Sequence, residues 1–170
     1  FQRPIKLAKD ASPKIPAIRH LFFESEKFFK KTYNMIVDLD VTSPLRTHLD
    51  IINSIKKIIK DKADNLVSVS PSRRNPYFNM LELKNNKVSL VKKPKKKVYR
   101  RQAAPKVYDM NASIYIWRRK TLINSNDICN KKTSLFVMPQ NRSLDIDSIF
   151  DSKLVEFIMK KKINILKKYD

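Results

Sequence analysis

Three aspartates lie close together in a strongly basic chain, in the stretch SLDIDSIFD at residues 143–151. If this stretch is a strand, Asp145 and Asp147 share one face about 6.6 Å apart along the backbone, and Ile146 turns toward the core. Two carboxylates on one face can flank a hard cation, and Mg²⁺ prefers oxygen ligands. Alternatively, both are exposed at a strand end and help to cap the following helix. Asp151 is expected to cap that helix and to stabilise it electrostatically.

The first seventy residues have the pattern of a βαβ unit, which implies a parallel sheet. The expected elements are a helix at 16–30, a strand at 34–40, a helix from Thr47 to about Lys62, and a strand at 65–70. Thr47, with Asp50 three residues later, has the pattern of a capping box.

Residues 71–110 differ in character and are interpreted as an excursion from this core. They contain two short strand-like pieces around the turn KNN at 84–86. Beyond them, strands are expected at 112–117 and 134–139, and an amphipathic C-terminal helix at 153–169.

Composition bounds the class of protein. The chain has 170 residues and 42% hydrophobic content, enough for one domain with a core. It has neither an 18-residue apolar span nor a signal-peptide pattern at its start, so a membrane protein is not expected and a cytoplasmic location is. A single cysteine, Cys129, excludes an internal disulfide, and the separation of His20 from His48 argues against a zinc site.

A net charge of +21 raises the possibility of a nucleic-acid-binding protein. Much of the excess is lysine, however, which codon usage in AT-rich genomes also produces. The run KKPKKK at 92–97 equally suits a solvated loop, and there is no recognisable nucleic-acid-binding motif. The chain also has no glycine, so it cannot contain a glycine-rich phosphate loop.

Several stretches, in this order, resemble the acylneuraminate cytidylyltransferases, which include the CMP-sialic acid synthetases and their legionaminic acid relatives. They are RPIKLAKDAS at 3–12, DLDVTSPLRTHLDI at 38–51, RRQAAPKVYDMNASIYI at 100–116 and SLDIDSIFD at 143–151. TSPLR alone is moderately specific, whereas the set with this spacing is highly specific. The stretch ADNLVSVSPSRRNPYFNM at 63–80 is most similar to the branch that activates legionaminic acid.

The resemblance implies an α/β, Rossmann-like three-layer nucleotidyltransferase fold with a mostly parallel sheet. It implies condensation of CTP with a nine-carbon 2-keto sugar acid, a nonulosonic acid, to give the CMP-sugar and pyrophosphate with Mg²⁺. Residues 1–70 would form part of the core, 71–110 an inserted arm through which such enzymes form homodimers, and 111–170 the rest of the core. The N-terminal strand and the phosphate loop of the family have no counterpart here, so we expect the chain to be truncated at its N-terminus.

The resemblance also implies roles for individual residues. Asp145 and Asp147 would hold Mg²⁺ beside the α-phosphate of CTP, where the metal neutralises charge. Arg3 of the RP element would contact the nucleotide. Arg101 and Gln102 would lie in the sugar-binding region, since an arginine can bind a carboxylate in a bidentate manner.

Four further residues would serve the sugar. Asn111 and Tyr115 can orient sugar hydroxyls, although Tyr115 can equally be a core residue. Ser43, like Arg46, belongs to a turn at the end of a strand, where ligands bind in open α/β sheets. Asp40 replaces a glutamine found in many sialic acid enzymes, so the position becomes acceptor-only, which suggests an altered sugar specificity.

Two alternatives accompany this interpretation. The chain can be a truncated, inactive synthetase-like protein that does not hold CTP, which calorimetry with CTP and Mg²⁺ would detect. The lesser alternative is a basic nucleic-acid-binding protein, whose affinity would fall steeply with salt.

Overall fold

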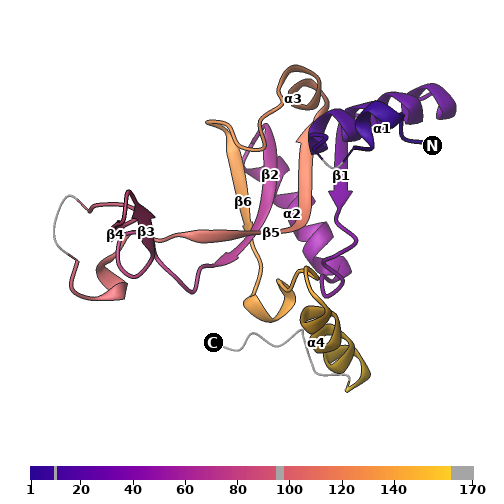
Figure 1. Ribbon diagram of the computed structural model, residues 1–170. Coiled ribbons are helices and arrows are strands. Elements are labelled where there is room, and N and C mark those ends of the chain that lie inside the picture. The colour runs from indigo at the N-terminus through magenta and orange to yellow at the C-terminus, as the bar shows by residue number, and fades with distance from the viewer. Residues whose placement is uncertain (10, 95–97, 162–170) are drawn as a thin grey trace.

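The computed structural model describes residues 1–9, 11–94 and 98–161 of the chain (Figure 1). These residues form a mixed α/β structure with one four-stranded sheet, a separate two-stranded sheet and four α-helices. The helices are α1 (Lys14–Phe29), α2 (His48–Lys60), α3 (Arg119–Asn124) and α4 (Ile149–Lys160). The strands are β1 (Met35–Leu39), β2 (Asn65–Pro71), β3 (Leu81–Lys84), β4 (Lys87–Leu90), β5 (Tyr108–Arg118) and β6 (Thr133–Val137). Three short 3₁₀ helices are η1 (Ile5–Leu7), η2 (Arg101–Ala103) and η3 (Gln140–Arg142).

The main sheet has the strand order β1-β5-β2-β6. β1, β2 and β6 run in one direction, and β5 runs against both of its neighbours. β1 and β2 therefore run parallel to each other, as the predicted βαβ unit requires. However, β5 lies between them, and only β2 and β6 are paired as parallel neighbours. The expectation of a mostly parallel sheet holds for strand direction and not for the pairing. Residues 113–117 of β5 are all buried, as expected for a strand in the middle of the sheet. The sequences of β1 and β2 alone do not show that β5 lies between them.

Both faces of the sheet are covered by helices, and β5 supplies side chains to both cores. Its alternating residues point to opposite sides, as in any strand. Tyr115 and Trp117 pack with α1 and α3, whereas Ile114 and Ile116 pack with α2. The core beside α1 contains Ile15, Ile18, Phe22, Val67, Val69, Tyr115, Trp117 and Leu122. The core beside α2 contains Ile58, Ala63, Leu66, Ile114, Ile116 and Met138.

Helix α2 begins as its sequence predicts. The Thr47 hydroxyl accepts a hydrogen bond from the backbone N–H of Asp50, and the Asp50 carboxylate accepts one from the N–H of Thr47. This capping box satisfies two N–H groups that a helix start otherwise leaves unpaired.

The segment between β2 and β5 leaves the main sheet and carries the β3–β4 hairpin (Figure 1). Asn85 and Asn86 form the predicted turn with φ of 51° and 58°, the geometry that suits a two-residue hairpin. Three apolar side chains of the hairpin, Leu81, Leu83 and Val88, are exposed. The basic run at 92–97 falls partly outside the described residues.

The stretch 143–151 differs from its prediction. Residues 143–147 form no strand, and a hydrogen bond from Ile146 N–H to Thr42 C=O (2.9 Å) ties their backbone to the turn between β1 and α2. The strand prediction was wrong because alternation over so few residues is also met by an irregular loop. Asp151 lies in the capping box of α4 as expected, with Ser148 as the N-cap residue. α4 ends at Lys160, and residues 162–170 of the predicted helix lie outside the described part of the chain.

Candidate active site

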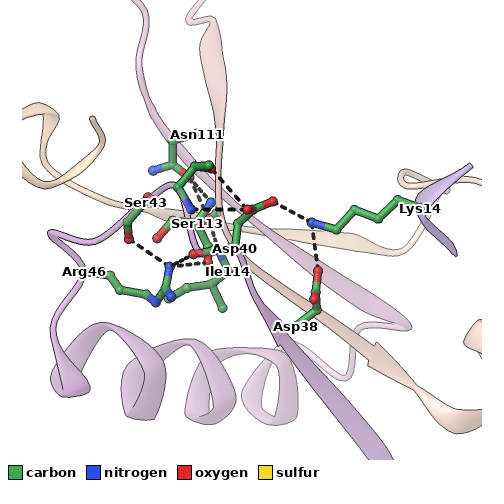
Figure 2. A network of polar contacts seen from close by, with 10 residues as sticks. Lys14, Asp38, Asp40, Ser43, Arg46, Asn111, Ser113 and Ile114 are labelled. Carbon is green, nitrogen blue, oxygen red and sulfur yellow. Dashed lines mark hydrogen bonds and ion pairs between the residues drawn. The ribbon is translucent and has the colours of Figure 1, made fainter. Parts of the chain in front are cut away.

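Four segments meet where β1 ends: the start of α1, the turn 40–47, the first half of β5, and the loop 140–147. Figure 2 shows the polar side chains that connect the first three of them. The segments come from distant parts of the chain, and each is positioned by hydrogen bonds rather than by packing alone.

Arg46 holds the turn after β1 against β5. Its Nη1 donates to the backbone carbonyls of Asp40 (2.6 Å), Ser43 (2.9 Å) and Ser113 (3.3 Å). Carbonyls in a tight turn after a strand lack ladder partners, and one guanidinium here satisfies those of Asp40 and Ser43. Its third bond, to Ser113 in β5, joins a carbonyl that also accepts from the N–H of Asp40 (3.4 Å). The Arg of the TSPLR motif is therefore an organiser of the site.

A bulge in β5 aims Asn111 into the interior. Ala112 has φ of 51°, and the register against β2 shifts between Val67 and Val69. Bulges of this kind re-aim side chains, and they are frequent beside active sites. The left-handed conformation costs an alanine about 1–2 kcal/mol relative to ordinary backbone.

The amide of Asn111 is fully engaged within the chain. Its Oδ1 accepts from the Ser68 hydroxyl (2.6 Å), and its Nδ2 donates to the Ser143 hydroxyl (2.9 Å) and to the sulfur of Met138 (3.5 Å). Asn111 thus ties β2, β5 and the loop before Asp145 together. A direct contact of this amide with a sugar stays a prediction, for which the structure leaves the amide little bonding capacity.

Lys14 joins two carboxylates of the site (Figure 2). Its Nζ lies 2.8 Å from Asp38 Oδ2 and 3.0 Å from Asp40 Oδ2, and it sits 4.3 Å from the ring centroid of Tyr115. Burial lowers the pKa of Lys14, but the hydrogen bonds and charges of Asp38 and Asp40 outweigh burial and raise it. Burial raises the pKa of Asp40, and the bonds from Lys14 and Thr42 outweigh it, so the net shift is downward. Lys14 and Asp40 are therefore both ionised at neutral pH.

Tyr115 is buried and stacks on Trp117 with 5.6 Å between the ring centroids. Burial raises the pKa of its phenol; the charge of Lys14 opposes this rise, while those of Asp40, Asp38 and Asp145 add to it. Tyr115 is thus a core residue whose edge adjoins the charged cluster, which agrees with the alternative considered from the sequence.

Three polar atoms around this centre are buried and have no hydrogen-bond partner among the described residues. They are the hydroxyls of Ser43 and Ser113 and the Oδ1 atom of Asp145. Ser43 and Ser113 are linked through Arg46, and Asp145 precedes the residue bonded to Thr42. Buried polar atoms are almost always satisfied, so a gathering of orphaned ones is consistent with a site that binds a polar ligand.

Asp145 and Asp147 have different environments. Asp145 is half-buried with an orphaned oxygen, whereas Asp147 is exposed. Among the described residues, no group of three or more carboxylate, histidine or cysteine side chains is placed to hold a metal. A closed cage is therefore not formed. Mg²⁺ commonly uses only one or two carboxylates together with water and substrate phosphates, and Asp145 fits that donor set.

A buried ion pair, missed by the sequence analysis, fixes the loop that carries these aspartates. Arg142 binds Asp50 through two bonds, Nε to Oδ2 (3.0 Å) and Nη2 to Oδ1 (2.8 Å). Their side chains are 11% and 5% exposed. Burial raises the pKa of Asp50, but the bonds from Arg142 and Thr47 outweigh it and lower the pKa below its ordinary value. The helix start at Asp50 thus anchors the loop that leads to Asp145.

The other predicted site residues lie elsewhere on the chain. Arg101 and Gln102 are exposed and line a pocket of about 630 Å³ beside the hairpin segment, where Arg101 donates to Ser72 C=O (2.7 Å). Arg3 is exposed in another pocket of about 570 Å³, which Lys14 and Asp38 also line. Within this chain, then, Asp40, Ser43, Asn111, Tyr115 and Asp145 lie around one centre, and Arg101 and Gln102 do not.

Lys14 and Asp38 were also missed. Lys14 lies outside the helix expected at 16–30, and Asp38 entered only as part of the expected strand and of the stretch 38–51. The spacing of Asp38 and Asp40 on one strand face was the available signal, since it is the same i, i+2 spacing that drew attention to Asp145 and Asp147.

Within residues 1–9, 11–94 and 98–161, no helix combines the length and apolar character needed to cross a membrane.

Comparison with known proteins gives the family. No family model matches the chain. The chain is 42% identical over 162 residues to post-translational flagellin modification protein B of Campylobacter coli, a match that covers 95% of this chain and 68% of that protein. It is 43% identical over 159 residues to the CMP-N,N'-diacetyllegionaminic acid synthase of Campylobacter jejuni, covering 94% and 67%. It is 31% identical over 111 residues to an N-acylneuraminate cytidylyltransferase of Streptococcus agalactiae, covering 65% and 26%. The chain belongs to the acylneuraminate cytidylyltransferase family.

Proposed function

We propose that the protein is a cytidylyltransferase that activates a nonulosonic acid of the sialic or legionaminic type. The sugar's anomeric hydroxyl attacks the α-phosphorus of CTP, and CMP-sugar and pyrophosphate leave. The observation that carries this proposal is the 43% identity, over 94% of the chain, to a relative named CMP-N,N'-diacetyllegionaminic acid synthase. We further propose the nucleotidyltransferase fold of this family, which the helix-covered sheet supports.

The geometry of the site supports a proposed role for each of its residues. Asp145, with Asp147, would hold Mg²⁺, which when bound neutralises phosphate charge and makes a sugar hydroxyl more acidic. Asp145 supports this role because one of its oxygens is buried and unsatisfied. Arg142 and Asp50 keep the loop in place, and Arg46 and Asn111 fix the surrounding backbone. Because these contacts already hold the site in place, its groups need little reorganisation during the reaction.

We propose that Arg101 and Gln102 contact the sugar acid from a second copy of the chain. Their distance from the main centre within one chain supports a contribution across an interface, with residues 71–110 as the dimerisation arm between core parts 1–70 and 111–170. Arg3 is proposed to contact the nucleotide, because its exposed guanidinium can bind a phosphate. The exposed apolar side chains of the β3–β4 hairpin suit such an arm.

The test is a pyrophosphate-release assay on the full-length gene product with CTP, Mg²⁺ and several nonulosonic acids. We expect release that requires both CTP and one of the acids, and a nucleotide product with the mass of the CMP-sugar. Absence of release with every acid, from a folded protein, would contradict the proposal.

A further inference from the structure

The Lys14 ammonium is fully occupied by the chain itself. It has three N–H donors, and two carboxylates and the face of an aromatic ring surround it. A cation held in this way has little capacity left for a phosphate or a carboxylate of a ligand. Lys14 can therefore affect a ligand only by orienting Asp38 and Asp40.

Asp40 retains bonding capacity, unlike Lys14. Its Oδ1 accepts from the hydroxyl (3.1 Å) and N–H (3.4 Å) of Thr42, and its Oδ2 accepts from Lys14. A carboxylate offers about four acceptor positions, so Oδ2 can accept one more bond. The side chain is 29% exposed, which leaves that position open.

Stability alone does not account for the cluster. Lys14, Asp38 and Asp40 have side chains between 24% and 35% exposed, and ion pairs this open contribute little to folding. The arrangement does fix the orientation and charge of Asp40 beside the buried atoms of Ser43 and Asp145 described above.

We propose that Lys14 is a specificity-determining positioning residue that acts through Asp40. By holding the carboxylate of Asp40 in one orientation, Lys14 presents the free acceptor position of Oδ2 in a fixed direction. The sugar accepted here therefore presents a hydrogen-bond donor at this place, such as a hydroxyl or the N–H of an acylamino group. An acceptor-only group at the same place is rejected, because two acceptors cannot pair. This inference rests on the proposed function.

The first experiment measures pyrophosphate release by the full-length Lys14→Met and Lys14→Arg variants with two acids. One acid is N,N'-diacetyllegionaminic acid, and the other is N-acetylneuraminic acid, which lacks the second acetamido group. We expect Lys14→Met to raise the KM for the diacetamido acid about tenfold, as for loss of one well-oriented charge-assisted bond, with KM for CTP unchanged. The KM for N-acetylneuraminic acid, whose hydroxyls are also donors, should rise as well, and Lys14→Arg should recover part of both losses.

The second experiment is a double-mutant cycle with Asp40→Asn. If Lys14 acts through Asp40, then Lys14→Met has little further effect on the KM for sugar once Asp40 is replaced. Lys57→Met is the matched control, because Lys57 also forms a single-chain ion pair, at 2.9 Å to Asp61, with a 40% exposed side chain. It lies on α2, is not a member of the site, and should leave both KM values unchanged.

The outcomes are separable. A wild-type protein without pyrophosphate release on any acid overturns the proposed function, and this inference with it. If the wild-type protein is active, either of two results overturns this inference alone. One is that Lys14→Met raises the KM for CTP and the KM for sugar equally. The other is that Lys14→Met reduces activity as much in the Asp40→Asn background as in the wild type. A Lys14→Met variant that fails to fold is replaced by Lys14→Gln, to which the same two criteria apply.

Discussion

Two ion pairs at neighbouring places in the molecule, Asp50–Arg142 and Asp40–Lys14, differ in almost every respect that matters. Asp50 and Arg142 are buried, paired through two bonds, and surrounded by the capping box of α2. Asp40 and Lys14 are about a third exposed and leave one carboxylate position unused. A closed pair of this kind fixes the backbone, whereas an open one can present a charge to a ligand. The same residue types thus serve a structural anchor and a candidate recognition element, and burial separates the two roles.

The largest effect is expected from removing the proposed metal ligand Asp145, in the loop that the Asp50–Arg142 pair anchors. Asp145→Asn should reduce kcat/KM at least about a hundredfold, because removal of a ligand's charge weakens stabilisation of the transferring phosphate. The unfolding free energy should be unchanged or rise, since the substitution removes the charge of a half-buried carboxylate that has an unpaired oxygen. Urea denaturation and the pyrophosphate assay measure the two quantities. A full loss of activity together with a lower stability would instead point to a structural role for Asp145.

Breaking the closed pair should mainly cost stability. Arg142→Met leaves Asp50 buried beside its helix N-terminus without its cation, and the unfolding free energy should fall by roughly 3 kcal/mol. Denaturant titration measures this change. Lys160→Met, on the exposed face of α4, is the control and should change stability negligibly. If both variants had equal stability, Arg142 would not be an anchor.

Lower pH should reduce the difference in stability between the wild type and Arg142→Met. The folded pKa of Asp50 lies below its ordinary value, so its contribution is complete above the unfolded pKa of about 4 and is lost as pH falls through the folded value. The stability gap between wild type and Arg142→Met should therefore shrink between about pH 5 and pH 3. Denaturation curves at several pH values check the sign. A gap that widens on acidification would contradict the ionised pair.

The smallest expected effect on stability concerns the hairpin. Leu83→Lys places a charge on an exposed apolar face that Val88 shares across the β3–β4 pair. We expect the monomer to lose less than about 0.5 kcal/mol, because the side chain is already solvated. If residues 71–110 form the dimer arm, light scattering should show dissociation of the full-length protein. Glu82→Lys, on the other face of β3, is the control that keeps the dimer.

Local features were predicted well and long-range ones were not. The capping box of Thr47 and Asp50, the Asn85–Asn86 turn and the strands at β1, β2, β5 and β6 follow from patterns confined to a few residues. The neighbour of β1 could not be predicted in this way, because strand order depends on which strand is buried on both faces.

The candidate site shows the same division. Asp40 and Asp145 were identified from motifs that resemble a family, but the ion pairs that fix Asp40 and the loop before Asp145 were not. Lys14 lies 26 residues from Asp40, and Arg142 lies 92 residues from Asp50. Such pairs have no local periodicity. The strand assigned to residues 143–147 was wrong for a related reason, since a strand needs a partner that the stretch itself does not specify.

The bulge at Ala112 also has a consequence for how the site can vary. Tyr115 pairs with Val67 and Met110 with Val69, so four residues of β5 lie between the two pairs where β2 has one. The surplus residues of β5 include Ala112 with its positive φ, and they turn Asn111 toward Ser68 and Met138. Point substitutions leave this register intact, whereas deletion of one residue would place Tyr115 and Trp117 on the opposite side of the sheet. We expect natural diversity in this part of β5 to consist of exchanged side chains and not of gaps.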